Sequence, residues 1–424
     1  MKQSHIAVVG GGITGVTTAY ALARRGFDVT LYERHRYAAM ETSFANGGQL
    51  SASNAEVWNL PATVLKGLKW MLRADAPLLV SPRPSWHKLS WFAEFIAAMP
   101  HYERNTIETT RLAIAAREHL FDWAETEGIP FDLKREGILH IYRDKAGFDH
   151  AGRVSALLAR GGLERRAVTP TEMKAIEPTL AGDYFGGYYT ESDSTGDIHR
   201  FTFGLAQAAA RRGVRCLYEQ QVDAIRSDAD GVTITATGPD GERQVRRHDG
   251  VVVCAGVASR RFAAALGDRV NIYPVKGYSI TVHLDDAASR AAAPHVSLLD
   301  DATKLVTSRL GPDRFRVAGT AEFNGENRDI RADRIRPLVD WVHDCFPGVD
   351  TRRVTPWAGL RPMMPDMLPR VGRGRAANVF YNTGHGHLGW TLSAVTADMV
   401  AGTVAAAFDP TASVVAGPLT PAPV

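Results

Sequence analysis

Hydrophobic residues at both ends of the chain follow the pattern of alternating strands and helices. Ile6–Val9 is a continuous apolar run, which is typical of a strand buried on both faces of a parallel sheet. A glycine-rich turn, a helix and a second strand are expected directly after it, at 10–15, 17–25 and 28–33. Together they form one strand–helix–strand unit of the usual length. The same alternation returns in a strand at 379–382 and an apolar helix at 391–408.

The middle of the chain has a different pattern. Residues 58–127 are rich in aromatic side chains, helical in spacing and interrupted by prolines, so we assign them to a second domain. Residues 271–354 alternate in the manner of antiparallel strands and end in a helix at 335–346. Between these regions, a helix is expected at 197–212 and strands at 214–218, 222–225, 231–237 and 250–254. The sequence therefore predicts an α/β protein in which a Rossmann-type domain is interleaved with an antiparallel-sheet α+β domain.

Composition narrows the class of protein. The 424 residues are 45% apolar and 22% charged, and the net charge is only +3. These values are ordinary for a soluble globular protein, and they give no reason to expect nucleic acid as a partner. The cysteines, Cys216, Cys254 and Cys345, are widely spaced, so we expect neither a disulfide framework nor a metal site.

Two features of the sequence bear on location. The run Ile6–Val9 ends in glycines and is too short for the core of a signal peptide. No stretch approaches the roughly 20 apolar residues that a membrane helix needs. We therefore expect a cytoplasmic protein. A peripheral contact with the inner face of the membrane stays open, because 58–79 combines apolar residues with Lys66, Lys69 and Arg73; an ordinary amphipathic helix is the alternative.

The turn after the first strand carries three glycines in the spacing Gly10-x-Gly12-x-x-Gly15. In such a loop one glycine allows the tight turn, one lets the backbone approach a pyrophosphate, and one lets the helix pack closely on the strand. The N-terminus of the helix then offers free N–H groups and a positive dipole to the phosphates. Glu33 ends the second strand, where an acid can accept hydrogen bonds from ribose hydroxyls and disfavours the 2′-phosphate of NADP. The pattern predicts a dinucleotide site.

Two further glycine-rich segments favour FAD over NAD. Residues 42–48, Thr-Ser-Phe-Ala-Asn-Gly-Gly, follow the second strand closely and could wrap the far side of a large cofactor. Residues 384–391 open the apolar C-terminal helix, and a helix N-terminus favours negative charge. A reduced flavin carries negative charge at one edge of its ring, whereas a nicotinamide cofactor does not ordinarily need a second such site. We therefore expect FAD as the cofactor.

Several segments, in the same order along the chain, resemble those of one enzyme family. They are Glu41-Thr42-Ser43-x-Ala45-Asn46-x-Gly48-Gln49, Leu65-Lys66-x-Leu68-Lys69-Trp70-Met71, Thr195-Gly196-Asp197, Tyr273-Pro274-Val275-Lys276-Gly277-Tyr278-Ser279, Gly359-Leu360-Arg361-Pro362-Met363 and Tyr381-Asn382-Thr383-Gly384-His385-Gly386. Over nearly its whole length the chain is similar to the D-amino acid dehydrogenase branch of the FAD-dependent glycine oxidase/D-amino acid oxidase superfamily. The resemblance implies oxidative deamination of a D-amino acid to a 2-oxo acid, with a hydride transferred to flavin N5. It also implies that the electrons pass to a quinone or another acceptor.

The motifs and the resemblance together indicate which residues hold the cofactor and the substrate. FAD contacts are expected from Gly10, Gly12, Ile13, Thr14, Gly15, Glu33, Arg34, Thr42, Ser43, Asn46, Gly47, Gly48, Gln49, Val222, Ala255, Gly256, Arg361, Gly384, Gly386, His387, Leu388, Gly389, Trp390 and Thr391. Arg361 is the candidate clamp for the substrate carboxylate, since similar enzymes place an arginine of this motif over the flavin. Tyr278 is a second candidate for the clamp or the pocket wall, and His387 is a candidate for a group beside the flavin. A core tyrosine and a structural histidine are the alternatives.

Some segments depart from the pattern of this branch. His387 stands where a threonine is usual, and residues 51–56, 198–200 and 364–369 differ as well. The substrate could therefore be a cyclic or N-substituted amino acid. Three alternatives stay open: a dehydrogenase that passes electrons to a quinone or carrier, an oxidase that uses O₂ and acts on glycine-, sarcosine- or proline-like amines, and an inactive flavin-binding subunit.

The two domains are expected to be discontinuous. The FAD-binding domain is predicted to comprise 1–56, 151–180, 196–270 and 356–424, and the substrate domain 57–150, 181–195 and 271–355. The flavin ring is expected between the two domains, because pockets commonly form at such junctions.

Overall fold

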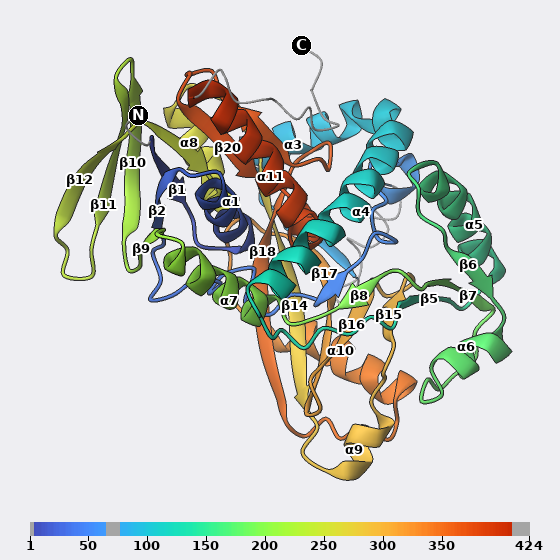
Figure 1. Ribbon diagram of the computed structural model, residues 1–424. Helices are drawn as coiled ribbons and strands as arrows, with labels where there is room; N and C mark the ends of the chain where they lie inside the picture. Colours follow the sequence, from blue (N-terminus) through green and yellow to red (C-terminus); the bar gives the residue numbers. More distant parts are fainter. Residues whose placement is uncertain (1–3, 65–76, 409–424) are drawn as a thin grey trace.

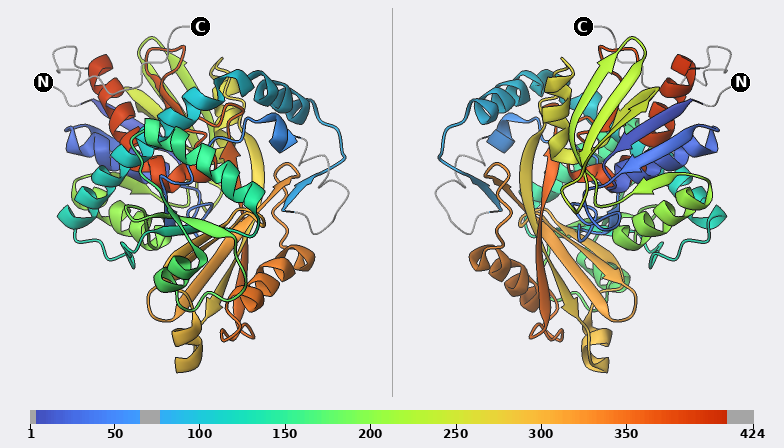
Figure 2. Two further views of the ribbon diagram at one scale, coloured as in Figure 1. Left: turned by 90° about the vertical axis from the view of Figure 1, so that its right-hand side faces the viewer. Right: turned by 90° about the vertical axis from the view of Figure 1, so that its left-hand side faces the viewer.

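The structure is a computed structural model that describes residues 4–64 and 77–408. Two expectations from the sequence, a helix over 65–72 and a loose tail from 412, lie outside these residues. Two large sheets form the frame of the molecule (Figure 1). One contains the N-terminal strands, and the other extends below it in both views of Figure 2.

The predicted Rossmann-type unit is built on a six-stranded sheet. Its strand order is β19 (Arg370–Arg373), β20 (Val379–Thr383), β13 (Gly250–Val253), β1 (His5–Val9), β2 (Asp28–Tyr32) and β9 (Arg215–Leu217). Neighbouring strands are parallel except β19 and β20, which are antiparallel. The central strand β1 is buried on both faces, as its continuous apolar run predicts.

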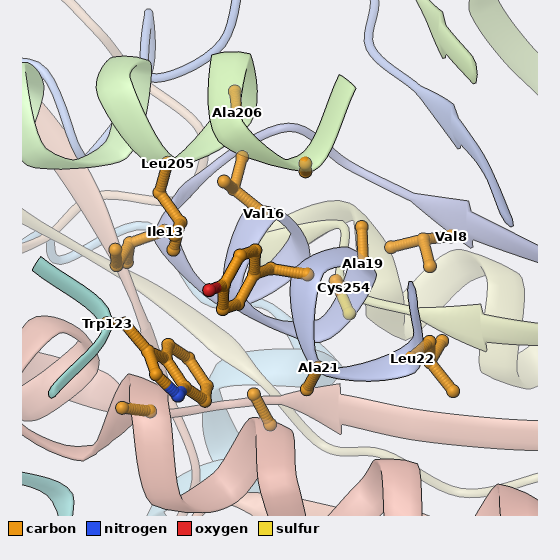
Figure 3. Close-up of a cluster of buried hydrophobic side chains, with 14 of the residues drawn as sticks. Val8, Ile13, Val16, Ala19, Ala21, Leu22, Trp123, Leu205, Ala206 and Cys254 are labelled. Atoms are coloured by element: carbon orange, nitrogen blue, oxygen red, sulfur yellow. The ribbon is translucent and has the colours of Figure 1, made fainter. Parts of the chain in front are cut away.

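Helices cover one face of this sheet. α1 (Ile13–Arg24) packs against α7 (Ile198–Arg211) and α11 (Gly389–Phe408), and α11 also packs against α4 (Tyr102–Thr126). Side chains from α1, α4 and α7 meet in one buried cluster. Val16 of α1 lies near Leu205 and Ala206 of α7 (Figure 3), and the ring of Tyr20 packs on that of Trp123 of α4 with centroids 5.1 Å apart. Small residues on α1 let these helices approach closely, so this face of the sheet is sealed from solvent.

A small sheet and a short helix cover the opposite face. They are β10 (Gln221–Asp228), β11 (Gly231–Thr237), β12 (Arg243–His248) and α8 (Ser259–Ala265). β12 carries three arginines, and most of its side chains are exposed to solvent. The strand itself was not expected, because five polar or charged residues in six carry no apolar alternation that would indicate a strand.

The second sheet has nine strands. Its order is β18 (Val354–Met363), β14 (Tyr273–His283), β17 (Arg314–Phe323), β16 (Leu305–Leu310), β15 (Ser297–Asp300), β5 (Ile138–Tyr142), β7 (Gly186–Thr190) and β6 (Arg166–Val168), and β4 (Leu78–Val80) pairs with β17. The predicted antiparallel character holds for most neighbours. Two pairs are parallel, β5 with β15 and β4 with β17. The sheet is therefore mixed, because its strands come from segments far apart along the chain.

Strand pairing differs from the predicted domain boundaries at three places. β3 (Gln49–Leu50), in the predicted FAD-binding domain, pairs with β8 (Ser194–Thr195), in the predicted substrate domain. β6 lies within 151–180, which the sequence assigns to the FAD-binding domain, yet it pairs with β7 at the end of the nine-stranded sheet. β18 crosses the predicted boundary at 356, and it pairs with β14 along its whole length. Both strands therefore belong with the substrate-domain sheet. A three-residue strand such as β6 has too few positions to reveal its partner in the sequence.

Each face of the nine-stranded sheet has its own helix. α10 (Ala332–Cys345) packs on the face that carries Ile280 and Val282 of β14. α3 (Trp86–Ala97) packs on the opposite face, against Tyr273 and Val275. The remaining elements are β3 (Gln49–Leu50), which pairs with β8 (Ser194–Thr195), and the helices α5 (Lys145–Arg160), α6 (Pro170–Ile176) and α9 (Ala287–Ala292). The α3 side of the sheet faces the cavity described below.

One helix in the described part of the chain, Gly386–Phe408, is long and apolar enough to cross a membrane. The expectation that no stretch approaches this length was therefore wrong. In the structure this segment contains α11, which lies between α1 and α4, and 56% of its most apolar window is buried inside the protein. A helix that is apolar on all sides suits this central position as well as it suits a membrane.

Candidate active site

A cavity of about 730 Å³ lies between the two sheets. Its lining runs from Val9 after β1 to Thr391 in the first turn of α11, and includes β14, β17 and β18 of the second sheet. Every residue that the sequence nominates for FAD or substrate lines this cavity except Gly15. Gly15 faces the opposite way, because a Cβ there would stand 1.8 Å from the carbonyl oxygen of Gly10. It serves the close packing of α1 on the loop.

The glycine loop has the geometry of a phosphate cradle. Gly10 has φ 109°, a left-handed conformation, and a Cβ there would meet the Cys254 carbonyl oxygen at 2.6 Å. Gly12 caps α1 with ordinary angles, φ −74° and ψ 179°, and a Cβ there would come no closer to the protein than 3.5 Å, at Ser43 Oγ. The chain itself therefore does not require glycine at Gly12. The missing side chain leaves room in the cavity at a helix N-terminus, and this fits the pyrophosphate of FAD.

Glu33 ties the loop to the second strand. Its Oε2 accepts a hydrogen bond of 2.6 Å from the Gly11 N–H, and its Oε1 accepts one of 2.8 Å from the His35 N–H. The carboxylate is buried and lines the cavity. Ser43 Oγ accepts a further bond of 3.0 Å from the Ile13 N–H at the start of α1. An acid in this place can also accept bonds from ribose hydroxyls, as the sequence predicts.

Residues 42–48 form a loop that the nine-stranded sheet holds from below. Ser279 Oγ of β14 donates to the Ala45 carbonyl oxygen at 2.7 Å, and Ser308 Oγ of β16 donates to that of Gly47 at 2.6 Å. Arg316 of β17 reaches the Asn46 carbonyl oxygen at 3.4 Å, and Thr42 Oγ1 donates to that of Leu360 at 2.8 Å. Three strands of the second sheet therefore fix a loop that comes from the first. The sequence gives no sign of these contacts, since their partners are more than 200 positions away.

The C-terminal glycine loop closes the cavity from the other side. Gly384 and Gly386 have φ 79° and 58°, and the chain then enters α11 at Gly389. The N-terminus of α11 points its free N–H groups and positive dipole at this part of the cavity. Two helix N-termini, those of α1 and α11, thus face one enclosed space. A long anionic cofactor such as FAD can reach both helix N-termini, whereas a shorter nucleotide would occupy only one of them.

Arg361 brings a positive charge into the cavity. Its guanidinium lies flat over Gly277 of β14, where a Cβ would stand 2.4 Å from the Nη1, Nη2 and Cζ atoms. Nη1 donates to the Thr320 carbonyl oxygen at 2.8 Å, and no ion pair joins this guanidinium to an acid within 4–64 and 77–408. Burial lowers the pKa of Arg361 to about 10, so it remains a cation at neutral pH. A carboxylate on a ligand is the natural partner for such a group.

Comparisons with known proteins agree with this geometry. The model of the FAD-dependent oxidoreductase family matches residues 5–403. The chain belongs to this family. It is 63% identical to D-amino acid dehydrogenase 3 of Mesorhizobium japonicum over 94% of this chain and 97% of that one, and 42% identical to a D-amino acid dehydrogenase of Paramagnetospirillum magneticum over 94% and 95%.

Solved structures give the same fold. The glycine oxidase of Geobacillus kaustophilus superposes with a TM-score of 0.72 at 21% identity, over 95% of each chain. The L-proline dehydrogenase of P. horikoshii superposes with a TM-score of 0.72 at 17% identity, over 96% of this chain and 94% of that one. The predicted α/β fold and the predicted cofactor, FAD, are therefore confirmed. Which side chains touch the FAD of this oxidoreductase stays a prediction.

Tyr278 lines the cavity of this FAD-dependent oxidoreductase, but its hydroxyl is directed elsewhere. It donates to Glu322 Oε2 at 2.8 Å, on the α10 side of the sheet, where Lys276 lies 3.4 Å from Glu322 Oε1. β14 and β18 pair with Val275 opposite Arg361 and Tyr278 opposite Ala358. Because opposed residues share a face and neighbours alternate, Tyr278 and Arg361 point to different faces. The hydroxyl is thus committed within the core, as the core-tyrosine alternative expects.

His387 lies where the C-terminal glycine loop meets the wall of the cavity. Its ring stacks on Trp58 with centroids 4.8 Å apart and an angle of 20° between the planes. Nε2 donates to the Asn54 carbonyl oxygen at 3.2 Å, which places the proton on Nε2. Burial, together with the nearby Arg361 charge, lowers the pKa of His387 to about 4. The imidazole is therefore neutral at physiological pH, and it joins the C-terminal glycine loop to residues 54–58.

The segment that makes this wall has no predicted role in the site. Residues 54–60 alternate along the cavity: Asn54, Glu56, Trp58 and Leu60 line it, and Ala55, Val57 and Asn59 are buried behind. The pattern was present in the sequence as a polar residue at 54 and 56 followed each time by an apolar one. Because residues 51–56 differ from the pattern of the related enzymes, the resemblance does not indicate where this segment lies in the fold.

Asp193 fixes the start of that wall. Its carboxylate is buried and accepts backbone N–H bonds from Ala52 at 3.0 Å and from Ser53 at 3.1 Å. Arg117 of α4 balances its charge at 2.8 Å. Ser53 Oγ also bonds to His140 Nε2 of β5 at 2.8 Å. The turn that leads into the wall is therefore anchored to both α4 and β5.

Proposed function

We propose that this FAD-dependent oxidoreductase oxidises D-amino acids to 2-oxo acids and passes the electrons to a quinone or another carrier. The observation that carries the proposal is the Arg361 guanidinium, which lies in the cavity beside His387 without an acidic partner among the described residues. An arginine in this setting can hold an α-carboxylate with two parallel hydrogen bonds. The relative from Mesorhizobium japonicum, named D-amino acid dehydrogenase 3, supports the choice of substrate class.

The chemistry asks for orientation more than for acid–base catalysis. Bound FAD would supply a two-electron acceptor, at flavin N5, for the hydride that leaves the α-carbon of the substrate. Arg361 would fix the carboxylate and thereby decide which face of the α-carbon is presented. The amine loses one proton to solvent, and the resulting imine takes up water and releases ammonia to give the 2-oxo acid. His387 is neutral and donates from Nε2 to Asn54, so it serves the shape of the site.

Anaerobic reduction of the bound flavin is the direct test. The visible absorbance of oxidised FAD is followed after mixing with D-, L-, cyclic and N-methyl amino acids, in the wild type, Arg361→Ala and Arg361→Lys. We expect selective bleaching by D-amino acids, and a loss of about 100-fold or more in kcat/KM for Arg361→Ala, since a charged hydrogen-bond pair is worth about 1.5–3 kcal/mol and orientation adds to it. FAD should stay bound in both variants. Normal kcat/KM in Arg361→Ala would refute the clamp.

The electron acceptor is part of the proposal. A quinone would require contact with the inner face of a membrane, and a cytoplasmic protein with a peripheral contact is the location we propose. The alternative is an oxidase of glycine-, sarcosine- or proline-like amino acids that uses O₂. Admitting air to the reduced enzyme separates the two: fast reoxidation with one hydrogen peroxide per turnover favours the oxidase, and slow reoxidation that a soluble quinone accelerates favours the dehydrogenase.

A further inference from the structure

One acidic side chain lines the wall of the cavity without a role in the chemistry above. Glu56 sits between Asn54 and Trp58, and all three side chains or carbonyls face the same space. Asn54 and Trp58 both touch His387, through the 3.2 Å hydrogen bond and the ring stack. Two residues of chain span at most about 7 Å, so the backbone of Glu56 lies within that distance of each. Glu56 is therefore next to the part of the cavity that His387 lines.

Two side chains from neighbouring helices hold the carboxylate of Glu56 in place. Tyr102 of α4 donates to its Oε1 at 2.7 Å, and His150 Nε2 of α5 lies 3.7 Å from the same atom. Burial, together with the negative charge of Glu56, raises the pKa of the Tyr102 hydroxyl, so the tyrosine stays a donor. Within the part of the chain that the structure describes, no lysine or arginine forms an ion pair with Glu56. The side chain keeps 29% of its surface exposed.

Among the described residues, Glu56 has no lysine or arginine partner, whereas two other charged residues of the lining pair with each other. Asp301 and Lys304 line the same cavity, and they form an ion pair with each other. Arg361 lies beside His387 and is expected to be occupied by the α-carboxylate of the substrate. A fixed carboxylate with one oxygen bonded to a tyrosine still has lone pairs on its second oxygen for a ligand. A ligand that carries an anionic group at one end and a cationic group at the other matches this distribution of charge.

We propose that Glu56 is a specificity-determining residue that selects D-amino acids with a positively charged side chain, such as D-lysine or D-arginine. The inference rests on the proposed function, since it adds a side-chain subsite to the carboxylate clamp. Arg361 would hold the α-carboxylate, and Glu56 would receive the ammonium or guanidinium group of the side chain. Aliphatic D-amino acids of the same length would leave the Glu56 carboxylate unpaired, and D-glutamate would be repelled.

The test compares Glu56→Gln with the wild type by anaerobic stopped-flow reduction of the bound flavin. Glutamine keeps the shape and can still accept from Tyr102, so the wall should stay intact. D-lysine, D-norleucine and D-glutamate are the substrates, because they have similar length and differ in side-chain charge. We expect the ratio of reduction rate to Kd for D-lysine to fall on the order of 10- to 100-fold, that for D-norleucine to change less than about threefold, and that for D-glutamate to rise.

A matched control is Glu103→Gln. Glu103 neighbours Tyr102 on α4, pairs with Arg160 at 2.8 Å and does not line the cavity, so none of the three rates should change. Equal effects of Glu56→Gln on all three substrates, or no effect on any, would overturn the inference while the proposed function stands. Failure of every D-amino acid to reduce the flavin of the wild type would instead overturn the proposed function and this inference with it.

Discussion

Replacing Gly277 by alanine should displace the proposed clamp without disturbing the rest of the protein. The added Cβ would stand 2.4 Å from three atoms of the Arg361 guanidinium, about 1 Å short of the 3.4 Å at which ordinary contact begins. Gly277 lies inside β14 and is not in the left-handed region, so its backbone accepts alanine. The guanidinium is the end of a flexible side chain and must therefore move. Its 2.8 Å bond to the Thr320 carbonyl would be stretched or lost.

A displacement of this size has a calculable effect on catalysis. A shift of about 1 Å in a positioning group costs on the order of 100-fold in rate, or about 2.7 kcal/mol. We expect Gly277→Ala to lower kcat/KM for D-amino acids by 10- to 100-fold, mostly through poorer orientation, while FAD content and thermal stability stay near those of the wild type. Anaerobic flavin reduction measures the kinetic change, flavin absorbance per protein measures FAD content, and a melting curve measures thermal stability.

Gly402→Ala is the matched control, because a Cβ there in α11 meets only Arg25 at 3.9 Å. Alanine in a helix interior should raise stability by about 0.5–1 kcal/mol and leave kinetics unchanged. If Gly277→Ala keeps full kcat/KM, the position of Arg361 over β14 does not matter for the reaction, and the argument for the clamp fails. If it loses FAD, the substitution has disturbed more than one side chain.

Two further outcomes follow from the site. Glu33→Gln should raise the Kd for FAD roughly tenfold. The amide oxygen can accept a hydrogen bond from only one of the N–H groups of Gly11 and His35, and the amide NH₂ then faces the other. Titration of the apoprotein with FAD measures this Kd, and an unchanged Kd would contradict the prediction. His385 is buried, and burial lowers its folded-state pKa to about 3, whereas the unfolded chain takes up this proton below about 6.5. Stability should therefore fall as pH falls through that range, by ~2 kcal/mol between pH 7 and 5 from this group. Denaturant unfolding of His385→Gln should show a decline smaller by that amount, and an equal decline in both proteins would refute the assignment.

Local features of the fold could be predicted from sequence, and pairings between distant segments could not. The sequence predicts the first strand, the glycine loop and Glu33, because a buried parallel strand is continuously apolar and the loop has a fixed spacing. β6 and most of β18 fall in the predicted FAD-binding domain, because a hydrophobic pattern indicates a strand but not its partner. The expectation that no stretch is long and apolar enough for a membrane helix fails at Gly386–Phe408, because the helix begins before the apolar pattern predicted at 391–408.

The candidate site divides in the same way. Arg361 and the glycine loops follow from motifs, and all but Gly15 of the nominated residues line one cavity. Tyr278 shows what a motif leaves out, because only the register between β14 and β18 decides that its hydroxyl points away from Arg361. Glu56 carried a signal, the alternation over 54–60, but its partners Tyr102 and His150 come from two helices that the sequence does not bring together.

The loop at 42–48 has a consequence for how the enzyme is made. Its partners lie late in the chain: Arg316 bonds to the Asn46 carbonyl oxygen, and Thr42 donates to that of Leu360. The cavity lining extends to Thr391, later still. A ribosome delivers the glycine loop early and these partners only near the end of synthesis. Cofactor loading must therefore wait until almost the entire polypeptide has emerged. Until then, an N-terminal fragment carries the nucleotide motif but has no enclosed space to retain a flavin, and chains that terminate early are left colourless.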